Sequence, residues 1–213
     1  MGNKINANGF RISVNKGWNS RWFATTKDYK TLVHEDIKVR KVITDKIKNA
    51  GIHRIEIVRS SDKVIINLTV GKPGVVIGRA GKDIEVLKAE VAALIGKPVQ
   101  INIHEVQNPY LSSALVVQNI IDALEKRVLP KVIMAQQLEK VNSAGALGVK
   151  IWVSGIGKNK QVGTEKKEAG RVPLTTLRAN IDFAMGEAQI KAASERKMGV
   201  KVWIYLGEKL GYE

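Results

Sequence analysis

Apolar and polar residues in the first half of the chain follow two different periods. Apolar side chains recur at helical spacing over residues 34–50 and again over 84–94. Alternation of apolar and polar residues over 52–59, 64–70 and 99–103 predicts strands, the first two forming an antiparallel pair. A glycine-rich segment separates the second strand from the second helix. The predicted order is therefore helix, strand, strand, glycine loop, helix, strand.

The pattern starts again at Asn108-Pro109, where Asn suits a helix N-cap and Pro suits the first helical position. Helical spacing then predicts helices over residues 111–128 and 132–144. Alternation predicts three or four strands, the second of them ambiguous, near 149–153, 160–166, 177–183 and 200–206. We expect the second half to be two helices on an antiparallel sheet, and the whole chain to be of the α+β class.

The start of the chain has a different composition. Between Met1 and Lys27 there are five basic residues and no acidic ones, with glycine and asparagine interleaved. Such a segment buries too little to order itself and is predicted to be an arm that settles on a phosphate-rich surface. Trp18, Trp22 and Phe23 either stack on bases or pack against the next helix. The predicted divisions are a basic arm at 1–30, a first domain at 31–107 and a second at 108–213.

The net charge narrows the class of partner. The 213 residues include 35 Lys and Arg against 20 Asp and Glu, which gives a net charge of +15 and a pI near 10.0. Both halves of the chain are basic, so a polyanion is the natural partner. The alternative is a soluble basic protein whose charged faces are only solvated.

Several other classes of protein are disfavoured. No apolar run approaches the length of a membrane span, and the first ten residues lack the apolar stretch of a signal peptide, so we expect a cytoplasmic chain without a membrane partner. There is no cysteine, and His34, His53 and His104 lack the spacing of metal ligands. We therefore expect neither a metal nor a cofactor.

The segment most informative about chemistry is the loop Gly78-Arg79-Ala80-Gly81, which follows an apolar run and precedes a helix. It is not a phosphate-binding Walker loop, because Asp83 stands where Ser or Thr is required. Nor do the glycines fit a dinucleotide-binding fingerprint. A G-x-x-G loop between helices is typical of a KH domain, in which the glycines let the backbone approach a nucleic-acid strand. An ordinary helix turn is the alternative.

Five separated groups of residues resemble motifs of the bacterial small-subunit ribosomal protein S-three family, whose members contain a KH domain. The groups occur in the same order as in that family. They are Met1–Lys4 with Gly9–Arg11, Pro73–Gly78, Val99–Val106, Gly170–Leu174 with Thr176–Ala179, and Gly199–Tyr205. The resemblance covers the whole chain. It implies a type II KH domain followed by an α/β two-layer domain, with two helices on an antiparallel sheet.

The resemblance also implies a function. It predicts a structural constituent of the small ribosomal subunit that binds 16S rRNA in the subunit head, among neighbouring head proteins. It further places the protein where messenger RNA (mRNA) enters, helping to position mRNA for translation. The chain departs from the family at 130–137, where Lys131 remains of a basic cluster, and at 155–166, where the sequence diverges from the usual glycine-containing strand pair. Lys131 is the candidate mRNA contact.

The candidate RNA contacts come from three parts of the chain. The loop region contributes Lys72, Gly78, Arg79, Ala80, Gly81 and Lys82. The arm contributes Lys4, Arg11 and Arg21, and the second domain contributes Arg171 and Arg178. For the last two arginines, a structural ion pair with Glu168 or Asp182 is the alternative.

Two other functions compete with the ribosomal one. A free-standing KH regulator of single-stranded RNA would use the same loop, but it leaves the second domain and the basic arm without a role. A nuclease or DNA lyase needs a constellation of His, Asp and Glu or an activated nucleophile, and the sequence offers none at motif spacing. Asp182 is expected to pair with a basic residue. We therefore predict that the protein is not an enzyme.

Overall fold

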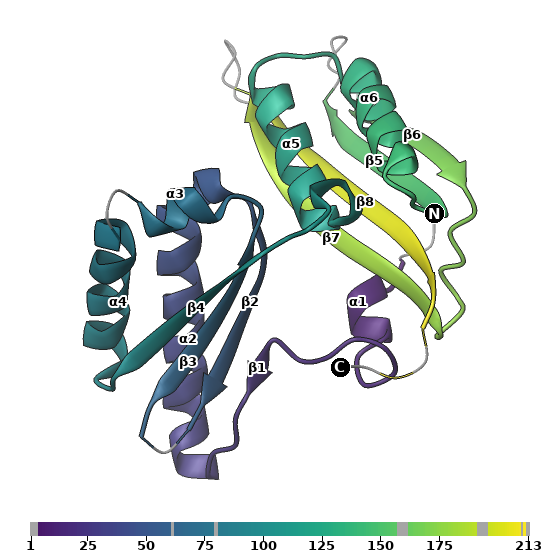
Figure 1. The fold of residues 1–213 in the computed structure, drawn as a ribbon. Coiled ribbons are helices and arrows are strands. Elements are labelled where there is room, and N and C mark those ends of the chain that lie inside the picture. The colour runs from purple at the N-terminus through teal and green to yellow at the C-terminus, as the bar shows by residue number, and fades with distance from the viewer. Residues whose placement is uncertain are drawn as a thin grey trace. The chain divides into compact units, whose positions relative to one another are not determined.

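The computed structural model describes residues 4–60, 62–78, 81–156, 162–190, 196–209 and 211. The chain divides into two compact units (Figure 1). We call Trp18–Gln107 the central unit, and Met1–Gly17 together with Asn108–Glu213 the terminal unit. The structure thus divides the chain at Asn108, where the sequence pattern starts again, but it also joins the first residues to the second half.

The central unit is a mixed sheet with helices on one face. Its elements are β1 (Ser20–Arg21), α2 (Thr26–Lys46), the 3-10 turn η1 (Lys48–Ala50), β2 (Ile52–Arg59), β3 (Val64–Val70), α3 (Pro73–Ile77), α4 (Lys82–Ile95) and β4 (Val99–Glu105). The strand order is β1-β2-β3-β4. Strands β2 and β3 are antiparallel, whereas β1 with β2 and β3 with β4 are parallel. The predicted order of elements is confirmed, with α3 added before the glycine loop.

The core of the central unit follows from the two sequence periods. Every second residue of β3 is buried, from Val64 to Val70, and these side chains meet Val39 and Ile43 of α2 and Val91 of α4. Helix α2 begins at Thr26, eight residues before the predicted start at 34. Its first turns are largely polar and exposed, so no apolar period could show them; instead the Thr25 hydroxyl donates to the Asp28 carboxylate over 2.7 Å.

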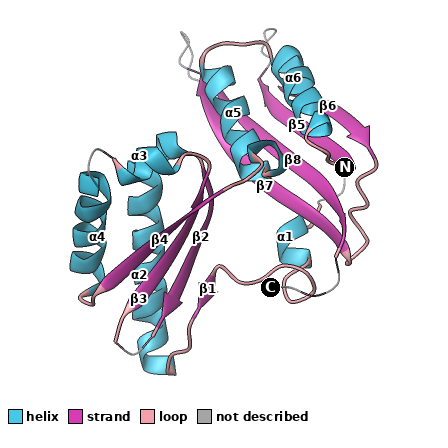
Figure 2. Cartoon of the chain, viewed as in Figure 1, coloured by secondary structure: helices cyan, strands magenta, loops and turns pink. Residues whose placement is uncertain are grey.

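The terminal unit has two helices on one face of an antiparallel sheet, as predicted (Figure 2). Its elements are α1 (Ala7–Phe10), η3 (Pro109–Leu111), α5 (Ser113–Glu125), α6 (Pro130–Ser143), β5 (Gly148–Ile156), β6 (Val162–Gly170), β7 (Ala179–Ile190) and β8 (Arg196–Glu208). The strand order is β6-β5-β8-β7. Alternate residues of β5 and β8 join α5 and α6 in one apolar core. The strand that was ambiguous in the sequence is present as β6, and it is longer than its pattern suggested.

The start of α5 differs from the expectation. Asn108 makes no side-chain capping bond, and Pro109 begins a short 3-10 turn. Ser112 is the residue before the helix, and its hydroxyl accepts from the backbone N–H of Leu115 over 3.5 Å. The Asp182 carboxylate of β7 also accepts from the backbone N–H of Ser113 over 2.8 Å. A carboxylate at this end of the helix offsets the unpaired N–H groups, a contact that only the tertiary fold supplies.

The expectation of a free arm at 1–30 is corrected for the described residues. Helix α1 packs on the sheet face opposite α5 and α6, where Ala7 joins Ala179, Ile181 and Trp203. The part from Trp18 onward belongs to the central unit, where the indole N–H of Trp22 donates to the Asp36 carboxylate over 2.9 Å. The segment is ordered because each part has partners far along the sequence.

Candidate nucleic-acid interface

Glycine is required at Gly78, the first residue of the predicted RNA-binding loop. Its backbone has φ +70° and ψ −173°, a region that essentially only glycine occupies. A Cβ atom placed there would lie 2.0 Å from the Asp83 carboxylate. At the far end of the loop, Gly81 has φ +77° with open space around it and precedes the first residue of α4. The end of α3 and the start of α4 are therefore each set by a glycine with positive φ.

Replacing Gly78 with alanine is expected to lower the free energy of unfolding of the central unit by about 1–3 kcal/mol, because the residue must keep a strained backbone. The Asp83 side chain must also move. Gly74→Ala is the matched control, since Gly74 lies in α3 at ordinary φ and open space surrounds the position that a Cβ atom would take. Urea unfolding of both variants measures the difference. Equal stability of the two variants would contradict the backbone argument.

Cations flank this loop at both ends. Lys72 is exposed and precedes α3, and Lys82 is exposed at the first position of α4. Arg79 and Ala80 lie outside the described residues. Beside the loop, Val75 and Ile77 are 48% and 41% exposed, so apolar surface lies next to the two lysines. Backbone that can approach closely, flanking ammonium groups and nearby apolar surface together suit a single strand of nucleic acid.

Arg11 is not at the surface, so the prediction that it contacts RNA is corrected. Its side chain is 0% exposed. The guanidinium donates to the backbone carbonyl oxygens of five residues: Ala7, Pro173, Leu174, Thr176 and Ala179. Burial lowers the pKa of Arg11 from its ordinary value. The residue holds α1 to the segment before β7, and its donors are not available to a phosphate.

The other two basic residues predicted from the start of the chain are exposed. The Lys4 ammonium lies 4.2 Å from the centroid of the Trp152 ring in the terminal unit. Arg21 lies in β1 of the central unit, opposite Val58 of β2. The two therefore belong to different units rather than to one continuous arm, and both stay predicted RNA contacts.

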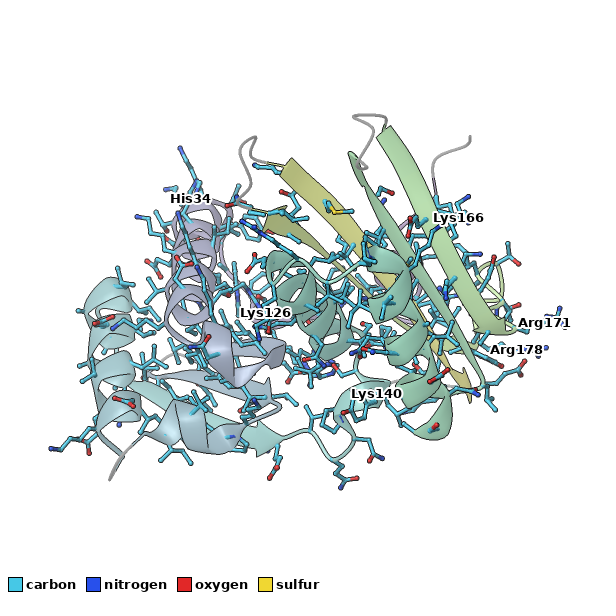
Figure 3. The ribbon with its side chains drawn as sticks, turned by 90° about the horizontal axis from the view of Figure 1, so that it is seen from above. His34, Lys126, Lys140, Lys166, Arg171 and Arg178 are labelled. Carbon is cyan, nitrogen blue, oxygen red and sulfur yellow. The ribbon has the colours of Figure 1, made fainter. Side chains whose placement is uncertain are left out.

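Arg171 and Arg178 are exposed on the terminal unit, where Figure 3 shows them projecting outward. Arg178 Nε lies 3.4 Å from Glu208 Oε2, and both side chains are more than half exposed. The alternative ion-pair partners are engaged elsewhere: Glu168 with Lys150, and Asp182 with Lys16 and Ser113. An exposed ion pair contributes little stability, so Arg178 can exchange Glu208 for a phosphate at small cost. Both arginines remain predicted RNA contacts.

The candidate mRNA contact also lies on the terminal unit. Lys131 is exposed in the first turn of α6, between Leu129 and Val132, which are 52% and 45% exposed. This helix end therefore presents one ammonium group between two exposed aliphatic side chains. The divergent segment 155–166 forms the ends of β5 and β6, and residues 157–161 lie outside the described part of the chain.

Sequence reasoning missed one basic cluster, formed by Lys150 and Lys166 around Trp152. Only the register of β5 against β6 brings these residues together, although each lay in a predicted strand segment. Over the described ranges, no three His, Asp or Glu side chains are grouped to hold a metal ion. Within those ranges, too, no helix has the length and apolar character needed to cross a bilayer.

Known protein families match a segment in each half of the chain. Residues 38–111 match the KH domain family, and residues 120–204 match the family described as ribosomal protein S3, C-terminal domain. The chain is 43% identical over 211 residues to the small ribosomal subunit protein uS3 of Carboxydothermus hydrogenoformans, covering 99% of this chain and 94% of that protein. For the uS3 protein of Bacillus cytotoxicus the identity is 44%, with the same coverage. The identity to the uS3 protein of Polaromonas naphthalenivorans is 42% over 212 residues, covering 99% of this chain and 71% of that protein. The chain therefore belongs to the small ribosomal subunit protein uS3 family.

Proposed function

We propose that this protein is a structural constituent of the small ribosomal subunit that binds 16S rRNA in the subunit head. Similarity to uS3 proteins along 99% of the chain is the observation that carries this proposal. The loop supports it, because Gly78 and Gly81 both have positive φ and a glycine without a Cβ atom lets a nucleic-acid strand come close to the backbone. Proteins of this family build the ribosome in the cytoplasm and are not enzymes.

The proposal has two finer parts. Neighbouring proteins of the head would contact the chain, and the terminal unit would lie beside the path by which mRNA enters, helping to position it. Lys131 supports the mRNA contact as an exposed cation at the end of α6. Crosslinking from a photoreactive group at position 131 in translating ribosomes tests it, with a crosslink to mRNA expected.

Cosedimentation distinguishes the ribosomal proposal from the alternative of a free-standing KH regulator. We expect the chain to sediment with small subunits when a lysate is fractionated on a sucrose gradient, and to remain there in moderate salt. A free-standing KH regulator would instead stay near the top of the gradient. Sedimentation there would overturn the ribosomal role while leaving RNA binding by the loop open.

A charge reversal in the loop tests the KH mechanism. The double variant Arg79→Asp, Ala80→Asp in the full-length chain is expected to weaken binding to an rRNA fragment about tenfold or more, because carboxylates beside phosphates repel. Lys88→Asp, Ala89→Asp is the matched control: it makes the same change in net charge at exposed positions of α4. Filter binding at fixed salt measures both. Equal losses would mean that net charge, and not the loop, governs affinity.

A further inference from the structure

The sheet face of β5 and β6 that points away from α5 and α6 carries a ladder of polar residues. Three cross-strand pairs form it: Lys150 with Glu168, Trp152 with Lys166, and Ser154 with Thr164. The residues of β5 that alternate with them are buried in the core beneath the two helices; they are Val149, Ile151 and Val153. Side chains alternate along a strand, so the ladder lies on the opposite face.

Three ammonium groups gather on this face. They belong to Lys4, Lys150 and Lys166, and lie 4.2, 5.3 and 4.7 Å from the centroid of the Trp152 ring. Glu168 supplies a carboxylate to the cluster, since its Oε2 lies 2.5 Å from Lys150 Nζ. The three ammonium groups together carry more charge than this carboxylate, which leaves an excess of positive charge around the Trp152 ring.

The electrostatics of the cluster agree with that excess. Burial lowers the pKa of Lys4, and the charges of Lys150 and Lys166 lower it further, while Glu168 opposes them. The hydrogen bond from Lys150 lowers the pKa of Glu168. An added anion would relieve the repulsion among the three ammonium groups, because opposite charges at close range favour the charged form.

The groups at this place are mostly donors. An ammonium group has hydrogens to donate and no lone pair to accept with, and the indole N–H is also only a donor. The Nε1 of Trp152 is buried and has no acceptor among the described residues, so the donors open to a ligand are the ammonium groups. The hydroxyl oxygens of Ser154 and Thr164 lie 3.0 Å apart at the next position of the ladder and are exposed. A ligand with several negatively charged acceptor oxygens suits this set.

We propose that Lys4, Lys150 and Lys166, gathered around Trp152, form a binding site for a phosphate group of the RNA backbone on the terminal unit. The proposal rests on the proposed function, since it takes rRNA as the source of the phosphate. An RNA strand is favoured over an acidic peptide by the net charge of +15, which suits a long polyanion. Figure 3 shows Lys166 on β6, the edge strand of the sheet.

The neighbouring residue of β6 provides a matched control. Lys166→Gln and Lys167→Gln remove the same charge from adjacent positions, but Lys167 pairs with Ile151 and so lies on the helix side of the sheet. The full-length protein is titrated with a 16S rRNA head fragment at several KCl concentrations. For Lys166→Gln, the slope of log K against log salt should fall in magnitude by about 0.7–0.9, the value for one phosphate contact. Lys167→Gln should keep the wild-type slope.

Glu168→Gln is expected to change RNA affinity in the opposite direction. Removing this carboxylate frees Lys150, so RNA affinity should rise, a gain that misfolding would not produce. Equal slopes for Lys166→Gln and Lys167→Gln, with wild-type RNA affinity intact, would overturn this site and leave the proposed function standing. A wild-type chain that fails to bind the fragment would overturn both. Weaker binding of Lys166→Gln to polyglutamate, with RNA binding unchanged, would assign the site to an acidic peptide and overturn the RNA assignment.

Discussion

Arg11→Ala is expected to lower the free energy of unfolding of the terminal unit by about 3–5 kcal/mol, among the largest effects of any single substitution. The guanidinium is fully buried and donates to five backbone carbonyl oxygens, at distances from 2.8 to 3.3 Å. Alanine would leave those oxygens without a donor and open a cavity beside Ala7. The contact of α1 with the sheet should therefore loosen.

Native-state hydrogen exchange measures this effect, because it reports the two units separately. Amides of β7 should exchange faster in Arg11→Ala, whereas those of β2 and β3 should not change. Arg178→Ala is the control: this arginine is 63% exposed with one ion pair, so its loss should change stability by less than about 0.5 kcal/mol. Equal protection of β7 in the two variants would mean that Arg11 does not anchor the N-terminal segment.

The same burial changes the expected electrostatic role of the N-terminal segment. An acid-free stretch with five basic residues predicts a clamp on phosphates, but Arg11 is enclosed and Lys16 Nζ lies 3.6 Å from the Asp182 carboxylate. Lys4 and Arg21 remain exposed, in different units. Deleting the segment would therefore remove packing as well as charge, so a point substitution at Lys4 is the cleaner probe of phosphate contact.

Periodicity predicted the fold well wherever a strand or helix has one buried face. The alternation of Val64, Ile66, Leu68 and Val70 was enough to place β3, because each apolar side chain is buried there. The two helices on the second sheet were predicted for the same reason. The missed features had no such signal: the start of α2 is polar, and the burial of Arg11 depends on partners more than 160 positions away.

The candidate site was predictable only where local sequence dictates the conformation. Gly78 and Gly81 could be recognised because a tight turn before a helix needs positive φ, which glycine adopts without strain. The cluster around Trp152 could not, since strand register brings Lys166 to Trp152, and Lys4 reaches it from the start of the chain. Charge alone does not distinguish an exposed lysine on an open sheet from a buried arginine.

The second large effect is expected in the central unit. Asp36→Ala should lower its free energy of unfolding by about 3 kcal/mol, because it removes one partner of a buried ion pair. Asp36 is 5% exposed and accepts from Arg59 Nη2 over 2.6 Å, from Trp22 Nε1 over 2.9 Å and from Ser20 Oγ over 3.1 Å. Its loss leaves Arg59 with Glu35 as its remaining carboxylate partner. It also removes two hydrogen bonds that tie Ser20 and Trp22 to α2.

A double-mutant cycle tests whether the lost stability of Asp36→Ala comes from its ion pair with Arg59. Adding Arg59→Met to Asp36→Ala should recover at least about 1 kcal/mol, since a buried charge that has lost its most buried partner costs more than an apolar replacement of the pair. Asp45→Ala on the same helix is the control, because its ion pair with Lys48 is exposed and should be worth less than about 0.5 kcal/mol. Hydrogen exchange in β2 measures the wild type, Asp36→Ala, Arg59→Met, the double variant and the Asp45→Ala control. Additive losses at Asp36 and Arg59 would show that the two side chains stabilise the unit independently, and that the carboxylate contributes mainly through Ser20 and Trp22.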